Sequence, residues 1–250
     1  MRALDAEHYV MDVRLRRERV PSFAQYPFAL PVLRNFSTLE LHPAVTFLVG
    51  ENGSGKSTLL EGIAAAWGFN PEGGTKNFRF ATRSSHSDLH EYLVLAKSVR
   101  RPKDGFFLRA ESFFNVASQI EELDEGPGGP PIINSYGGRS LHEQSHGESF
   151  FALMTHRFGG QGFYVLDEPE AALSPARQLA MLSRMHELVQ DRSQFIIATH
   201  SPLLMSYPDA WIYQINDDGI ERVAYRDTEH YELTRSFLNS PESYLRGLLD

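Results

Sequence analysis

The sequence contains no cysteine, which excludes disulfide bonds, cysteine-ligated zinc and catalysis by a thiol. No apolar run approaches the roughly 18 residues of a membrane-spanning helix. The first 20 residues carry four acids and five arginines, and they lack the apolar core of a signal peptide. From these absences we expect a soluble protein of the cytoplasm that does not insert into a membrane.

Positive charge is also scarce. The chain has 24 Lys and Arg against 32 Asp and Glu, a net charge of −8, which argues against a protein that coats nucleic acid by bulk charge. Cations nevertheless outnumber acids by five between residues 76 and 109. A surface for DNA or a DNA-bound partner explains this excess, and so does an ordinary solvated face. The cations are Lys76, Arg79, Arg83, Lys97, Arg100, Arg101, Lys103 and Arg109.

The length of 250 residues and a hydrophobic content of 42% predict one large globular domain over residues 1–250. Within it we expect a smaller helical lobe over 76–140. Helical periodicity over 58–67 and 175–189 alternates with short apolar runs, which predicts an α/β fold with a largely parallel central sheet. Three such runs are typical of strands buried on both faces: Val45–Val49, Phe163–Leu166 and Phe195–Ala198.

The segment Gly50–Ser57 fits the pattern G-x-x-x-x-G-K-[ST], and it follows a predicted strand and opens a predicted helix. Its glycines allow backbone N–H groups to surround phosphate oxygens, Lys56 supplies a positive charge, and the Ser57 hydroxyl can bind Mg²⁺. The sequence therefore predicts an ATP and Mg²⁺ site. Its predicted nucleotide-binding residues are Gly50, Asn52, Gly53, Ser54, Gly55, Lys56, Ser57 and Thr58.

Two acids follow the second apolar run. In a protein with such a phosphate loop, Asp167 is expected to hold Mg²⁺, and Glu168 to orient or deprotonate an attacking water. A glutamate directly after the aspartate favours water as the nucleophile, so hydrolysis is preferred over transfer to a metabolite. His200 follows the third run by two residues, at the strand end where α/β sheets bind their ligands, and is a candidate contact for the terminal phosphate or the water. Lys56, Glu168 and His200 are thus the predicted catalytic residues.

The segment 142–148 has two interpretations. His142-Glu143-Gln144-Ser145-His146 matches the H-E-x-x-H motif of zinc peptidases, with Glu168 as a possible third ligand. That motif needs both histidines on one continuous helix, whereas Gly147 follows at once and the amphipathic pattern begins after it. The alternative is a helix start at Ser145 that presents N–H groups to an anion.

Together the four motifs resemble the ATP-binding-cassette (ABC) class of P-loop ATPases in content and order. Gly50–Thr58 resembles Walker A, Ser145–Glu148 the signature motif, Val165–Pro169 Walker B, and His200 the switch histidine. Within the class the chain is similar to soluble members, the RecF-like, overcoming-lysogenization-like and chromosome-maintenance ATPases. It most resembles a small stand-alone family of bacterial predicted ATPases.

The chain departs from transporter cassettes at several positions. His146 and Glu148 replace a glycine and a glutamine of the transporter signature, and Ser174 replaces the aspartate of the D-loop. Residues 77–85, where the class places a glutamine, contain none.

The resemblance implies a small antiparallel β part beside the central sheet. It also implies a composite site in which Ser145, Gly147 and Glu148 of one protomer close over ATP held by another. We therefore predict an ABC-type ATPase that forms a homodimer on binding Mg-ATP and acts as a switch in DNA-related or defence processes. The alternatives are a transporter cassette, a zinc peptidase, and a nucleotide sensor in which binding matters more than turnover.

Overall fold

A six-stranded sheet forms the centre of the computed structural model, which describes residues 7–75, 87–109, 113–124 and 131–249. The strand order is β5-β6-β7-β3-β8-β9. All neighbours pair in parallel except β8 and β9, which form an antiparallel hairpin. The bounds are β3 Val45–Gly50, β5 Asp104–Arg109, β6 Gly162–Asp167, β7 Gln194–Ala198, β8 Trp211–Asn216 and β9 Gly219–Val223. The predicted α/β fold with a mixed, largely parallel sheet is confirmed.

A second, antiparallel sheet has the order β2-β1-β4, with β1 at Val10–Leu15, β2 at Thr38–Glu40 and β4 at Leu93–Lys97. The buried carboxamide of Gln194 attaches it to the central sheet. Its Oε1 accepts from the backbone N–H groups of Tyr9 and Val10 at 2.9 and 3.0 Å, and its Nε2 donates to the carbonyls of Val10 and His42. Three of these four hydrogen bonds are buried, and an unpaired buried amide is costly. Gln194 therefore fixes how β1 lies against β7.

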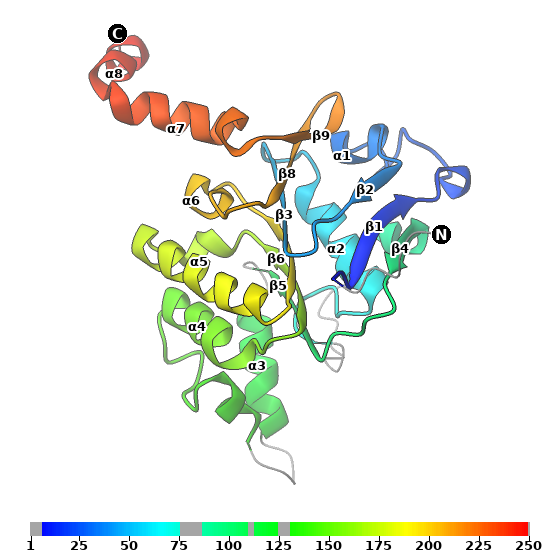
Figure 1. Ribbon diagram of the computed structural model, residues 1–250, viewed down its shortest axis with the longest axis vertical. Coiled ribbons are helices and arrows are strands. Elements are labelled where there is room, and N and C mark those ends of the chain that lie inside the picture. The colour runs from blue at the N-terminus through cyan, green and yellow to red at the C-terminus, as the bar shows by residue number, and fades with distance from the viewer. Residues whose placement is uncertain (1–6, 76–86, 110–112, 125–130, 250) are drawn as a thin grey trace.

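Helices cover both faces of the central sheet (Figure 1). One face packs on α4, α5 and α6, whereas the other packs on α2 and the small sheet. Alternate side chains of one strand pack into the hydrophobic cores on opposite faces of the sheet. In β7, Ile197 packs into one core and Ile196 into the other. Burial on both faces explains why these strands read as continuous apolar runs. The α-helices are α1 Pro31–Arg34, α2 Lys56–Trp67, α3 Phe113–Asp124, α4 His146–Ala152, α5 Pro175–Gln190, α6 Pro202–Met205, α7 Glu229–Asn239 and α8 Pro241–Leu249.

Short helical turns complete the described elements. Of these, the turn at Leu153–Arg157 continues α4 as a single π-helical turn. The 3₁₀ turns are η1 Arg17–Arg19, η2 Asp88–Tyr92, η4 Ile132–Tyr136, η6 Pro169–Ala172 and η7 Tyr225–Asp227.

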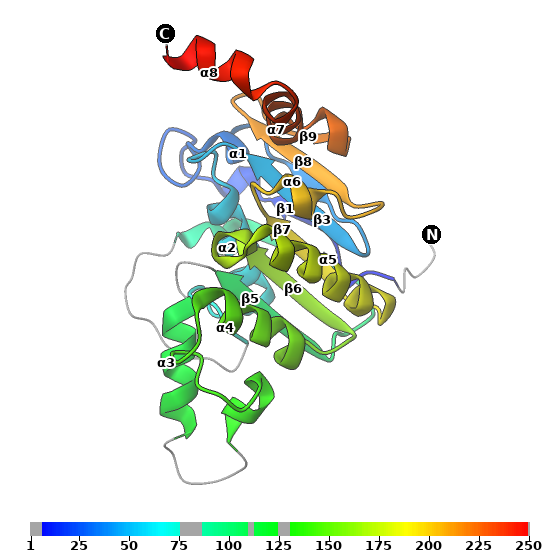
Figure 2. The same ribbon diagram turned by 90° about the vertical axis from the view of Figure 1, so that its left-hand side faces the viewer.

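The predicted lobe over 76–140 contains two strands that belong to the sheets: β4 lies in the small sheet and β5 at the edge of the central one. Phe106 and Leu108 of β5 are completely buried, which explains why this segment joins the body. Helix α3 lies at one end of the molecule, opposite α7 and α8 (Figures 1 and 2). The division of the chain into one domain and a lobe stays a prediction.

The parallel strands place the candidate motifs at one edge. β3 ends at Gly50, β5 at Arg109, β6 at Asp167 and β7 at Ala198. Because carboxyl ends of parallel strands share one edge of the sheet, the residues that follow these four strands converge there.

Candidate functional site

The loop between β3 and α2 needs its glycines for steric reasons. A Cβ on Gly50 would lie 2.5 Å from the carbonyl oxygen of Ile215, and one on Gly55 would lie 2.6 Å from Cγ1 of Val32. Both residues also adopt positive φ angles, of +150° and +96°. The loop is thus held between β8 and α1, and its backbone has the close approach that phosphate binding requires.

Lys56 begins α2 and is 4% exposed. Its Nζ donates to the carbonyl oxygens of Gly50 and Glu51, both at 2.8 Å. Burial lowers the pKa of Lys56, while the nearby carboxylates, Glu168 foremost, act in the opposite direction. The ammonium group therefore bonds to its own loop. A phosphate oxygen can replace these carbonyl oxygens as the acceptor of its hydrogen bonds.

Ser57 and Asp167 meet although 110 residues separate them: the Ser57 hydroxyl donates to Oδ1 of Asp167 at 3.0 Å. Asp167 is 5% exposed. A hydroxyl and a carboxylate oxygen are hard donors of the kind that Mg²⁺ prefers, and two such oxygens in contact can share one cation. The predicted Mg²⁺ ligands therefore lie together and fit the ion.

Arg109 also belongs to this edge, which the sequence analysis missed. It lies opposite Asp167 in the β5–β6 register, and its Nε is 3.7 Å from Oδ2 of Asp167. Its Nη1 donates to Oε2 of Glu61 at 2.8 Å. The expectation that Arg109 contributes to a basic outer surface is wrong, because the strand register turns its side chain to these two carboxylates.

Glu168 adopts a left-handed backbone conformation, with φ 50° and ψ 52°. This conformation costs a non-glycine residue roughly 1 kcal/mol or more and is typical of functional sites. The backbone N–H of Glu168 still donates to Ala198 at 2.9 Å, so the chain turns abruptly after β6. Its carboxylate, whose side chain is 41% exposed, lies 3.5 Å from Nε2 of His200. The predicted base and the predicted switch histidine are thus in contact.

His200 is held from two further sides. Its backbone N–H donates to Oε1 of Glu170 at 2.6 Å, and its Nδ1 lies 3.0 Å from Nε2 of His230. Burial lowers the pKa of His200, and the charge of Lys56 adds to that shift. Neither partner belongs to a motif that the sequence predicts. Glu170 could have been suspected from its place two residues after Glu168, whereas His230 carries no motif at all.

The segment 145–148 forms the start of α4. Ser145 and Glu148 form a capping box, in which both the N–H and the Oγ of Ser145 donate to Oε2 of Glu148, at 3.1 and 2.7 Å. These hydrogen bonds lower the pKa of Glu148. A Cβ on Gly147 would lie 2.6 Å from the carbonyl oxygen of Ala172, so the glycine lets α4 rest on η6. The predicted helix start at Ser145 is confirmed.

The segment 145–148 is separate from the phosphate loop of its own chain. Within the described residues, no hydrogen bond or ion pair joins Ser145, Gly147 or Glu148 to residues 50–58. Ser145 and Glu148 are exposed instead, and Glu148 lies 3.6 Å from Nη2 of Arg177.

Two models of the AAA domain type match this chain. One, described as "AAA domain", matches residues 22–112, which include the phosphate loop. The other, described as "AAA domain, putative AbiEii toxin, Type IV TA system", matches residues 132–206, which include Ser145, Asp167, Glu168 and His200. The chain carries an AAA/ABC-type P-loop ATPase domain.

Relatives of this ATPase domain include two curated transport proteins. The L-cystine transport system ATP-binding protein TcyN of Escherichia coli is 25% identical over 225 residues, which are 80% of this chain and 88% of that protein. The ABC transporter G family member STR2 of Medicago truncatula is 25% identical over 172 residues. That match covers 63% of this chain and only 24% of the plant protein.

A solved structure supports the fold. The protein cbiO1 from Clostridium perfringens, part of the ABC transporter complex cbiONQ, is 16% identical, with a TM-score of 0.50. The similarity covers 94% of this chain and 97% of that one. At this identity the likeness shows that the ATPase domain has the ABC fold.

The zinc peptidase interpretation is wrong. Residues 142–145 form turns, and α4 begins only at His146, so the two histidines do not share a helix as H-E-x-x-H requires. The Nε2 of His142 lies 3.1 Å from the hydroxyl of Ser118 instead. Among the side chains that the structure describes, no group of three His, Asp or Glu could hold a metal ion.

Part of the sequence-based interpretation lies outside the described residues. This applies to residues 77–85, where the ABC class places a glutamine, and to Lys76, Arg79 and Arg83 of the basic segment. In the described part of the chain, no helix of this ATPase domain is long and apolar enough to cross a membrane.

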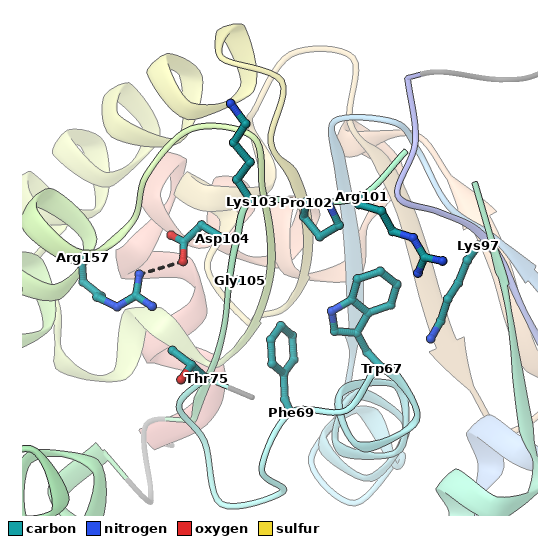
Figure 3. Close-up of a pocket in the computed structure, with 10 residues that line it drawn as sticks. All are labelled: Trp67, Phe69, Thr75, Lys97, Arg101, Pro102, Lys103, Asp104, Gly105 and Arg157. Atoms are coloured by element: carbon teal, nitrogen blue, oxygen red, sulfur yellow. Dashed lines mark hydrogen bonds and ion pairs between the residues drawn. The ribbon is translucent and has the colours of Figure 1, made fainter. Parts of the chain in front are cut away.

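A basic cavity of about 300 Å³ lies at the opposite edge of the sheet from the phosphate loop (Figure 3). It opens where α2 ends and β5 begins. Trp67 and Phe69 line it, and Lys97, Arg101 and Lys103 surround it. The Nζ of Lys97 lies 4.6 Å from the centroid of the Trp67 ring.

The one acid among these lining residues is already neutralised. Asp104 accepts from Arg157 at 2.7 Å, from the backbone N–H of Gly159 at 3.0 Å and from the Tyr164 hydroxyl at 2.8 Å. Among the described residues, Arg101 and Lys103 have no acidic partner. The cavity therefore has an excess of positive charge.

Proposed function

We propose that this chain hydrolyses Mg-ATP at a site that a second copy of the chain completes. The observation that carries the proposal is the convergence of Lys56, Ser57, Asp167, Glu168 and His200 at one edge of the sheet. A structural acidic turn does not need a lysine, a hydroxyl and a histidine around it.

The chemistry follows from these side chains. Lys56 and the loop N–H groups bind the phosphates, while Ser57 and Asp167 would hold the Mg²⁺ ion, which neutralises charge that builds up on the phosphate oxygens. Glu168 is exposed enough to meet a water molecule, and it takes the proton that the water loses on attack. His200 supports Glu168 from 3.5 Å and thereby limits where the carboxylate can lie.

A second cavity gives room for the rest of the nucleotide. It has a volume of about 340 Å³ and lies against loop residues 51–54, facing the β8–β9 hairpin. Glu51, Asp217 and Glu229 line it. Carboxylates repel phosphate but accept hydrogen bonds from hydroxyl groups, so this cavity suits ribose and base better than it suits a phosphate chain.

A second copy is needed because the segment 145–148, which resembles the signature motif, does not contact the phosphate loop of its own chain. Ser145 and Glu148 are exposed and have no bond to residues 50–58 in the described chain. In the ABC class the corresponding segment of one protomer closes on the ATP of another, and this arrangement would use an exposed capping box.

The dependence of rate on protein concentration tests this composite site. We expect the ATPase rate per chain to rise with protein concentration and then reach a plateau. Mixing Lys56→Ala with Ser145→Arg provides a sharper test. Each variant alone is inactive, but a mixed dimer joins the intact loop of one chain to the intact signature of the other. Activity that exceeds the sum of the two supports the proposal, whereas a rate per chain that is constant at every dilution contradicts it.

For the partner of this switch, the basic cavity supports nucleic acid. Four cations line this 300 Å³ cavity, and one of them, Arg157, neutralises its one lining acid; the remaining three positive charges fit a phosphate backbone. The net charge of −8 argues against binding by bulk charge, so such binding requires a local excess of cations like this one.

Charge reversal in the cavity tests the nucleic-acid partner. We expect Arg101→Glu together with Lys103→Glu to lower affinity for single-stranded DNA at least tenfold at low salt, because each lost cation weakens counterion release. Fluorescence anisotropy with Mg-ATP present measures the affinity. The control, Arg235→Glu with Arg246→Glu, changes net charge equally on α7 and α8. Equal affinity of both double variants would remove the cavity from the proposal.

A transporter cassette is the second candidate, and the names of both curated relatives favour it. Co-purification of the chain with a membrane subunit would establish it in place of the DNA-related role. The residues His146, Glu148 and Ser174, which differ from the transporter pattern, favour the DNA-related role over a transporter cassette.

A further inference from the structure

His230 lies in the first turn of α7, which is fixed to the body there. Thr228 caps the helix and is fully buried: its Oγ1 accepts from Tyr231 N at 3.3 Å and donates to the Tyr225 carbonyl at 2.8 Å. The rings of Tyr225 and Tyr231 also pack, with centroids 4.7 Å apart. Beyond this turn α7 extends away from the sheet (Figure 1). The position of His230 is therefore set by the body and not by the outer part of the helix.

Three side chains form a continuous line from α7 to the candidate base. The Nε2 of His230 lies 3.0 Å from Nδ1 of His200, and Nε2 of His200 lies 3.5 Å from Oε1 of Glu168. Within the described residues, Nδ1 of His230 and Nε2 of His200 are buried and form no hydrogen bond, so the 3.5 Å approach of His200 Nε2 to Glu168 is a close contact short of a full hydrogen bond. Few placements of the imidazole hydrogens put a donor opposite an acceptor at both contacts of this line.

Two neutral imidazoles at 3.0 Å must share one hydrogen. If Nδ1 of His200 held it, the lone pair of His200 Nε2 would face the Glu168 carboxylate, and two acceptors would repel. If Nε2 of His230 holds it, Nδ1 of His200 accepts and Nε2 of His200 carries a hydrogen toward Glu168. Only the second arrangement places a donor opposite an acceptor at both contacts.

The charges around the pair agree with two neutral rings. Burial is the main cause that lowers the pKa of each histidine, and the Lys56 ammonium lowers both further. Glu168 raises the pKa of His200, and Glu229 and Glu51 raise that of His230, without reversing either shift.

We propose that His230 is a positioning residue that fixes the tautomer of His200, so that its Nε2–H points at Glu168. This inference rests on the proposed hydrolysis, because it assigns a task to His200 in that reaction. His230 touches no reacting atom and acts through His200 alone. It also links the first turn of α7 to the nucleotide site.

Substitution of His230 separates its hydrogen bond from its bulk. His230→Gln retains an N–H donor at nearly the same place, and we expect it to keep at least half of the wild-type kcat. His230→Leu retains size without a donor, and we expect kcat to fall at least about tenfold with KM for ATP within about twofold. Leu238→Ala changes an exposed side chain on the outer part of α7, leaves the first turn intact and should keep wild-type kcat.

The tautomer itself can be observed without turnover. Nitrogen-15 spectra of the imidazole rings, with His200 assigned from His200→Gln, should show a protonated Nε2 and an unprotonated Nδ1 in the wild type and in His230→Gln. In His230→Leu the population of the Nδ1–H form should rise, because Nδ1 of His200 no longer accepts a hydrogen bond from His230 and only Glu168 still favours the Nε2–H form. If His200 keeps its tautomer and kcat in His230→Leu, the inference is wrong. A wild type without ATPase activity would contradict the proposed function, while the spectra would still report on His230.

Discussion

Replacement of Glu168 by glutamine is expected to lower kcat for ATP hydrolysis about a hundredfold or more, while ATP affinity changes less than about threefold. A general base contributes about 10² to 10⁴ to a rate, and an amide cannot take the proton of water. Glutamine keeps the size of Glu168 and can still accept from His200, so the 3.5 Å contact survives. Phosphate release under saturating Mg-ATP measures kcat, and equilibrium titration measures affinity.

The matched control for this variant is Glu187→Gln, because Glu187 is an exposed acid that pairs with Arg184 on α5. It should hydrolyse ATP like the wild type. If Glu168→Gln also hydrolyses ATP at the wild-type rate, Glu168 is not the base, and the roles assigned to it and to His200 are incorrect.

Lys56→Ala is expected to weaken ATP binding about thirtyfold or more. Truncating one partner of a buried, hydrogen-bonded charge pair costs about 2 to 5 kcal/mol, and each 1.4 kcal/mol is tenfold in affinity. Lys56 is 4% exposed and already bonds the carbonyls of Gly50 and Glu51, so its charge is confined to the loop. Stabilisation by a ligand reports the loss directly. Mg-ATP should raise the melting temperature of the wild type but not that of Lys56→Ala.

The exposed Lys103 provides the control for this variant. Lys103→Ala removes the same side chain at the far edge of the sheet and should bind ATP normally. A Lys56→Ala protein that melts cooperatively and yet gains wild-type stabilisation from Mg-ATP would show that the loop does not hold the phosphates.

Much of the central sheet could be predicted because its strands are buried on both faces. The three apolar runs became β3, β6 and β7, and the polar residues that end them became the phosphate loop, the acidic pair and His200. The hairpin of β8 and β9 follows from two apolar runs around a turn at Asp217 and Asp218. In these elements local pattern and tertiary environment agree.

The small sheet could not be predicted in the same way. Its strands are less completely buried than those of the central sheet and depend on distant partners, as when Gln194 bonds to Tyr9 and Val10. The sequence contains no local sign of a contact over that distance.

Three members of the site were missed for related reasons. Arg109 contacts Asp167 through strand register, and in the sequence it is one cation among eight. Glu170 accepts a hydrogen bond from the backbone of His200, 30 residues later in the chain. His230, on the helix that follows the β8–β9 hairpin in the sequence, contacts the His200 ring. The H-E-x-x-H match is misleading because a short pattern carries no information on where its helix begins, whereas Gly147 already favoured a helix start at Ser145.

The size of Glu168→Gln with and without Mg-ATP tests the central claim, a hydrolysis site completed by a second copy, most directly. One chain has a mass of 28.3 kDa. Light scattering during size-exclusion chromatography should give that mass without nucleotide and twice that mass with Mg-ATP, with ATP bound in the larger species. A chain of 28.3 kDa that carries ATP and stays single at every concentration would contradict the composite site.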